Sequence, residues 1–110
     1  MPLISLYTNC DAIDESNTCI ELSQIVADQL DKPLAVTMAR VFSNTSMSMG
    51  TKDKTALFEI EAIELNPQHA EPLTKRLCEF AQQFDVSPDM VFVKLHNVPR
   101  GMWGGNGKVY

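Results

Sequence analysis

Positive charge is scarce in this sequence and is never clustered. Nine Lys and Arg residues stand against 14 Asp and Glu residues, so the formal net charge is −5 at pH 7. No run of basic residues interrupts this acidic excess. A protein that binds mainly to a nucleic-acid backbone or an anionic membrane surface needs a basic patch. The composition therefore argues against both as main partners.

Cysteines and long apolar runs are also scarce. Cys10, Cys19 and Cys78 form no Cys-x-x-Cys pair, so neither a disulfide framework nor a cysteine metal site is predicted. No apolar stretch approaches the roughly 20 residues that a membrane helix requires. The N-terminus lacks the basic and apolar regions of a signal peptide. We expect a soluble, cytoplasmic protein, although leaderless secretion stays open.

The hydrophobic pattern of the 110 residues predicts one domain over residues 1–110. Apolar residues recur at spacings of three and four in two segments, which indicates one helix ending near Asp31 and another beginning near Asn66. Pro72 is expected to delay the regular part of the second helix. Trp103 lies in a glycine-rich tail that we expect to fold only against a larger body. Strands are predicted at residues 2–7, 36–42, 56–65 and 90–95.

The two halves of the chain resemble each other when one is shifted by half the length. Each half then has the order strand, helix, proline, strand. The shift aligns Leu22 with Leu77, Val26 with Ala81 and Pro33 with Pro88. A long helix between two strands favours a parallel pair, so two such units predict an α+β fold with a four-stranded mixed sheet and both helices on one face. Neighbouring subunits are expected to cover the other face. Chance similarity of two amphipathic halves is the alternative.

Pro2 is the first candidate for chemistry. Removal of Met1 is easy when the next residue is small, and it would expose a secondary amine at the start of a strand. An ordinary α-amino group has a pKa of roughly 8. Burial and a nearby cation would lower that pKa and leave a neutral base near physiological pH. Met-Pro starts are also common without any catalytic role, so Pro2 alone does not decide.

Lys32 is the second candidate. It follows the first predicted helix, where a cation is favoured by the helix dipole. The functional interpretation is an anchor for a substrate carboxylate close to the second strand. Taken alone, the position favours the helix-dipole interpretation.

Five short motifs occur in one order along nearly the whole chain. They are Met1-Pro2-Leu3-Ile4, Lys32-Pro33, Met47-Ser48-Met49-Gly50, Ser87-Pro88-Asp89 and Trp103-Gly104-Gly105-Asn106-Gly107. Their order and spacing resemble the macrophage migration inhibitory factor family of the tautomerase superfamily, particularly its bacterial-type members. The resemblance implies a homotrimer of β-α-β-β-α-β subunits, with three active sites at the subunit interfaces and no metal or cofactor.

The resemblance also implies an activity and a set of site residues. The activity is enol–keto tautomerisation of phenylpyruvate-type 2-oxo acids. Pro2 would be the catalytic base, and Lys32 would bind a substrate carboxylate or enolate oxygen. The implied substrate-binding residues are Leu3, Val36, Ile63, Phe92, Lys94 and Trp103.

Two positions depart from the animal members of that family. Phe92 replaces a tyrosine, so a phenolic hydrogen bond to substrate is missing, and Lys94 replaces an asparagine. Strand alternation places both side chains on one face. Two interpretations of Lys94 stay open. It binds carboxylate and lowers the pKa of Pro2, or it extends to solvent at the pocket rim.

The other polar residues that could suggest catalysis are interpreted as structural or solvent-exposed. His69 is expected to be solvated, and His96 shares the face of Phe92. Glu59 and Glu61 are expected to line a polar surface or a central channel. One rival function is a cytokine-like binding protein with vestigial tautomerase activity. Another is hydration or dehalogenation of an unsaturated acid, for which the sequence shows no arginine pair or acidic residue clearly placed to activate water.

Overall fold

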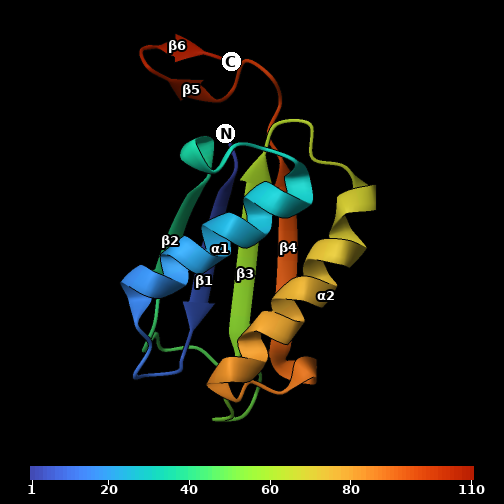
Figure 1. Ribbon diagram of the computed structural model, residues 1–110. Helices are drawn as coiled ribbons and strands as arrows, with labels where there is room; N and C mark the ends of the chain where they lie inside the picture. Colours follow the sequence, from blue (N-terminus) through green and yellow to red (C-terminus); the bar gives the residue numbers. More distant parts are fainter.

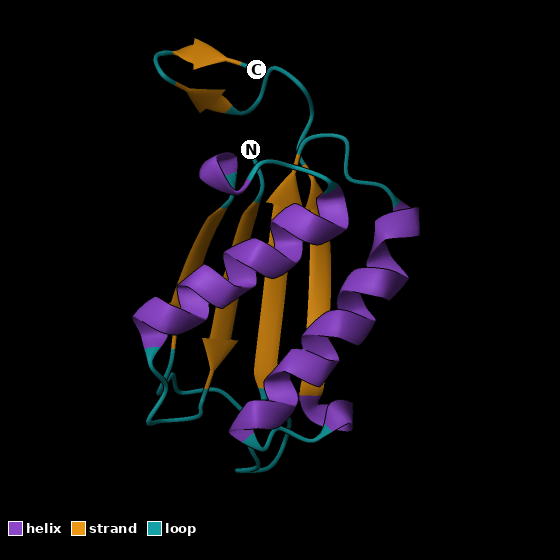
Figure 2. Ribbon diagram, in the orientation of Figure 1, coloured by secondary structure: helices purple, strands orange, loops and turns teal.

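Two α-helices cover one face of a four-stranded sheet in the computed structural model, which describes residues 1–110 (Figure 1). The strands are β1 (Leu3–Thr8), β2 (Met38–Phe42), β3 (Ala56–Ala62) and β4 (Val91–Asn97), in the order β2-β1-β3-β4. Helix α1 (Glu15–Leu30) connects β1 to β2, and α2 (Ala70–Ala81) connects β3 to β4. Figure 2 shows both helices on the same side of the sheet. The predicted α+β fold is confirmed.

The sheet is mixed because each half of the chain contributes one parallel pair. β1 pairs with β2 in parallel, and β3 pairs with β4 in parallel. The two pairs join through the antiparallel contact of β1 with β3. Leu22 and Leu77, which the shift aligns, are both fully buried. The internal repeat is therefore a repeat of structure.

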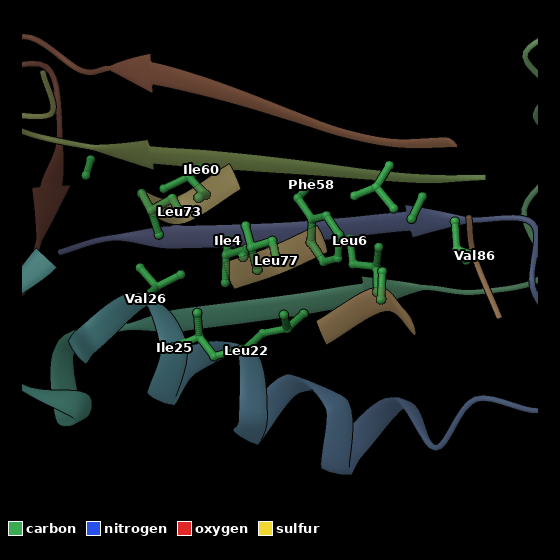
Figure 3. Packing of buried hydrophobic residues seen from close by; sticks show 14 of the residues in the cluster. Ile4, Leu6, Leu22, Ile25, Val26, Phe58, Ile60, Leu73, Leu77 and Val86 are labelled. Atoms are coloured by element: carbon green, nitrogen blue, oxygen red, sulfur yellow. The ribbon is translucent and has the colours of Figure 1, made fainter. Parts of the chain in front are cut away.

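The hydrophobic core lies between the sheet and the two helices. Ile4 and Leu6 on β1 and Phe58 and Ile60 on β3 are fully buried. Figure 3 shows these side chains gathered with Leu22, Ile25, Val26, Leu73 and Leu77 of the helices. Fully burying one such side chain contributes about 1.5–3 kcal/mol. This packing holds the two halves together.

Two predicted strands are too long, for local reasons. The second begins at Met38 rather than at Val36, because Val36 belongs to a 3-10 turn, Leu34–Val36, and donates its N–H to the carbonyl of Pro33 at 3.2 Å. The third ends at Ala62, because Glu64 adopts a left-handed conformation with φ of 61°. This turn leads the chain away from the sheet.

The second helix and the last long strand also begin with 3-10 turns. Pro67–His69 precedes α2, so the regular helix is delayed as predicted. Pro72 lies in the first turn of α2, where a missing N–H leaves no helical hydrogen bond unmade. Pro88–Met90 precedes β4, which begins at Val91.

The C-terminal tail forms a hairpin of its own, which the sequence analysis did not predict. β5 (Gly104–Gly105) pairs with β6 (Lys108–Val109) around Asn106 and Gly107. Both turn residues have positive φ, 53° and 74°, as Asn-Gly turns favour. The amide of Tyr110 donates to the carbonyl of Trp103 at 2.9 Å. Figure 1 shows this hairpin projecting beyond the end of the sheet.

The sheet face opposite the helices is uncovered and carries rows of side chains. Tyr7 stacks on Phe42, with ring centroids 4.9 Å apart. The register places Leu57 beside Tyr7 and Phe92 beside Leu57, which completes an apolar row. Phe42 and Phe92 are exposed. No helix of the chain is both long enough and apolar enough to cross a bilayer.

Candidate functional site

The start of the chain meets the ends of α1, β3 and β4 at one end of the sheet (Figure 1). Because β1 is antiparallel to β3, Leu3 lies opposite Glu61 near the end of β3. Pro2 is fully buried there. Its carbonyl accepts a hydrogen bond from the amide of Met38 at 2.9 Å. Pro2, the predicted catalytic base, is therefore held directly before the first residue of β1.

Lys32 reaches this end of the sheet because α1 ends two residues earlier, at Leu30. Asp31 is left-handed with φ of 52°, and the amide of Lys32 donates to the carbonyl of Ala27 at 2.9 Å. Lys32 and Ile63 line the same cavity of about 190 Å³. The remaining lining residues are Leu30, Glu64, Leu65 and His69. The structure thus brings two of the predicted site residues together around one hollow.

The electrostatics at the chain start favour a neutral amine. As encoded, the amine belongs to Met1 and the Pro2 nitrogen is part of a peptide bond. Burial lowers the pKa of the Met1 amine below its ordinary value of 8.0, and the charges of Lys32 and Arg100 lower it further. All three effects disfavour the protonated form.

Glu64 and Arg100 are the charged residues of this region that the sequence analysis missed. Arg100 donates a hydrogen bond from Nη2 to Oε1 of Glu64. This bond and the charge of Arg100 lower the pKa of Glu64, and Lys32 adds to the effect. One signal was available: both residues follow strands that end at the same edge of the sheet. The sequence analysis found no arginine pair and no acidic residue clearly placed to activate water; the structure adds one arginine, already paired with Glu64.

Phe92 and Lys94 lie on the uncovered face, away from Pro2 of the same chain. His96 lies opposite Glu61 and therefore near the level of Leu3. Phe92 precedes His96 by four strand positions in β4, which corresponds to roughly 13 Å. The two residues share a face, as predicted. Within one chain, the structure does not bring them to Pro2.

The other predicted site residues occupy three different elements. Leu3 is the first residue of β1 and is half-buried. Val36 lies in the turn before β2 and is exposed. Trp103 lies at the base of the C-terminal hairpin and is half-buried. All three belong to segments at the same end of the sheet (Figure 1).

His69 was expected to be solvated, but it is half-buried and hydrogen-bonded. It lines the cavity, and its Nδ1 accepts a hydrogen bond from the amide of Asn66 at 3.2 Å. This bond closes a capping box at the start of the 3-10 turn before α2. No group of three or more His, Cys, Asp or Glu side chains is placed to hold a metal ion.

The family model described as "Macrophage migration inhibitory factor (MIF)" matches residues 1–110. The chain belongs to the macrophage migration inhibitory factor family. The resemblance found in the sequence is therefore confirmed. Membership of this family supports the description of the chain as a MIF/tautomerase-type protein. A search of curated proteins finds no significant match.

Solved structures of other MIF proteins have the same fold. The homologue from Prochlorococcus marinus is 24% identical, with 98% of each chain covered and a TM-score of 0.88. The protein from Oncomelania hupensis is 20% identical over all of this chain and 82% of its own, with a TM-score of 0.91. The protein from Trichinella spiralis is 19% identical over 98% of this chain and 99% of its own, with a TM-score of 0.88.

Proposed function

We propose that this MIF-family chain is an enol–keto tautomerase of phenylpyruvate-type 2-oxo acids, with the free amine of Pro2 as general base after removal of Met1. The observation that carries the proposal is the setting of the chain start. Burial, Lys32 and Arg100 all lower the pKa of the Met1 amine, which lies one residue before the Pro2 nitrogen. A base that is neutral near pH 7 is what proton abstraction requires.

The reaction transfers one proton and leaves the overall charge unchanged. The amine lone pair takes the enol hydroxyl proton, and the O–H bond breaks to leave an enolate. As the C=O double bond forms, the electron pair of the C=C double bond takes a proton from the ammonium, which forms the C–H bond and regenerates the neutral amine. Lys32 would hold the carboxylate and offset the negative charge that develops on oxygen.

The walls of the proposed site come from two copies of the chain. Leu3, Val36, Ile63 and Trp103 lie at the same end of the sheet as Pro2. Phe92 and Lys94 lie in the first half of β4, whereas Pro2 of the same chain lies at the level where β4 ends. A homotrimer in which a neighbour supplies both residues would complete the site. The uncovered apolar row on the sheet supports such an assembly.

An assay of enol absorbance tests the reaction. Purified Met1-free protein is expected to accelerate the loss of the phenylpyruvate enol signal, and Lys32→Gln is expected to weaken substrate binding and lower kcat/KM. Pro2→Gly is expected to be much slower, because the replacement amine is primary and less constrained. Equal activity of Pro2→Gly and the parent would contradict the proposal.

The alternative is a cytokine-like binding protein with vestigial tautomerase activity. The projecting hairpin favours it, because Met102, Val109 and Tyr110 are exposed there. Negligible turnover by Met1-free protein, with binding to a protein partner that survives a blocked Pro2, would favour this alternative.

A further inference from the structure

The ion pair of Glu64 with Arg100 lies at the edge where β3 and β4 leave the sheet together. The amide of Val98 donates to the carbonyl of Ala62 at 2.9 Å. The amide of Leu65 donates to Oδ1 of Asn97 at 3.0 Å. These bonds fix the segments that carry Glu64 and Arg100, so the two side chains meet beside the start of the chain.

The ion pair is open to water. The side chain of Arg100 is 62% exposed and that of Glu64 is 66% exposed. Exposed pairs of this kind contribute little to folding stability because solvent screens them and the side chains are flexible. The pair therefore matters more for the charge of the site than for the stability of the fold.

The charges around the amine are two cations and one carboxylate. Lys32 and Glu64 line the same cavity, and Arg100 pairs with Glu64. Lys32 makes no ion pair. His69 also lines the cavity, with Nδ1 committed to the amide of Asn66. Among the side chains of Lys32, Arg100 and Glu64, the site carries one uncompensated positive charge.

The lysine that a neighbouring copy would supply does not alter this balance. Lys94 lies 3.0 Å from Oε1 of Glu59 in its own chain, where the two residues are directly opposite. Its charge is thus compensated by a side chain that would accompany it. The single uncompensated cation of the assembled site is still Lys32.

We infer that Glu64 is a specificity-determining residue: by occupying Arg100 it restricts the site to acids with one carboxylate and excludes dicarboxylic 2-oxo acids. The inference rests on the proposed function for the identity of the substrate class. A first carboxylate binds Lys32. A second carboxylate meets Glu64, and like charges placed together are a common means of rejecting a wrong ligand.

Charge-changing variants separate this role from a purely structural one, in which the ion pair only holds the C-terminal tail in place and is called a latch here. Glu64→Gln frees Arg100 and gives two uncompensated cations. Arg100→Gln leaves Glu64 unpaired and cancels Lys32. The double variant restores the parent net charge. A latch would be broken in the same way by either single change, whereas a charge filter responds in opposite directions.

Calorimetric titration with phenylpyruvate and with 2-oxoglutarate at pH 7 measures the selectivity without requiring turnover. The ratio of the dissociation constant for 2-oxoglutarate to that for phenylpyruvate is expected to fall roughly five- to tenfold in Glu64→Gln, as one exposed charge contact suggests. It is expected to rise in Arg100→Gln and to return toward the parent in the double variant.

The opposite outcomes are equally definite. Shifts in the same direction for both single variants, unchanged ratios, or no binding of either acid to the parent would overturn the inference. Failure of the proposed reaction gives a different pattern. In that case the enol assay is negative while the dissociation constants still follow the charge of the three residues.

Discussion

Lys94 and Glu59 form an ion pair across β3 and β4, with Nζ 3.0 Å from Oε1 and the two residues directly opposite in the register. The side chain of Lys94 is 54% exposed, whereas that of Glu59 is only 20% exposed. The pair spans a parallel strand contact on the uncovered face. Both interpretations of Lys94 stay predictions, and both must now include this partner.

Removal of Lys94 is expected to lower the free energy of unfolding slightly. Lys94→Gln leaves Glu59 half-buried without its cation, and we expect a loss of about 0.5–1 kcal/mol at low salt. Urea denaturation at one fixed protein concentration measures this change. Lys75→Gln is the matched control, because Lys75 is exposed and has no ion-pair partner. Equal stability of the two variants would show that the pair contributes nothing.

The repeated core positions are expected to be about equally important. Leu22→Ala and Leu77→Ala each remove a fully buried side chain at aligned positions of the two helices. Each is expected to lower the free energy of unfolding by about 2–5 kcal/mol. Ile20→Ala, at a position 58% exposed, is the control and should change stability by no more than about 0.5 kcal/mol. A small effect at only one of the leucines would mean that the halves do not share one core.

The fold could be predicted because its signals are local and repeated. Leu22 and Leu77 follow the helical period, and one shift of the chain relates the two halves. The predicted strand boundaries were wrong where the local backbone conformation, and not the hydrophobic pattern, decides where a strand begins or ends. Val36 is apolar but belongs to a turn, and Glu64 ends a strand through a positive φ.

The candidate site could be predicted only in part, because it depends on positions brought together by sheet topology. Pro2 and Lys32 stand at recognisable places in the sequence, at the chain start and behind a helix. The pairing of Glu64 with Arg100 requires two irregular segments to leave parallel strands side by side. The spacing of residues in the sequence does not predict that these two side chains touch.

The uncovered face is expected to hold a trimer together. Light scattering after size-exclusion chromatography should give about three times the 12.3 kDa mass of the chain. Phe42→Asp places a charge in the apolar row beside Tyr7 and is expected to shift the mass toward one chain. Ile20→Asp, on the exposed side of α1, should leave the mass unchanged. A parent protein with the mass of one chain would contradict the trimer.

The ion pair of Glu64 is expected to weaken in acid. Arg100 lowers the pKa of Glu64 in the folded chain below its ordinary value of 4.5. The stabilisation is therefore fully present above the ordinary pKa and is lost as the pH falls through the lowered one. Because the pair is exposed, the difference between the urea midpoints of the parent and of Arg100→Gln should be small at pH 7, and it should shrink further at pH 3. A difference that is equal at both pH values would exclude this interaction as its cause.

The pH dependence of kcat/KM tests the role of the Pro2 nitrogen most directly. Mass spectrometry first confirms that Met1 is absent, and a variant with one Ala inserted before Pro2 provides a chain whose Pro2 nitrogen is an amide. The Met1-free protein should turn over phenylpyruvate enol with a kcat/KM that falls in acid with an apparent pKa below 8, and the inserted variant should be inactive. Equal activity of the two proteins, or no activity of the Met1-free protein at any pH, would contradict a catalytic Pro2 amine.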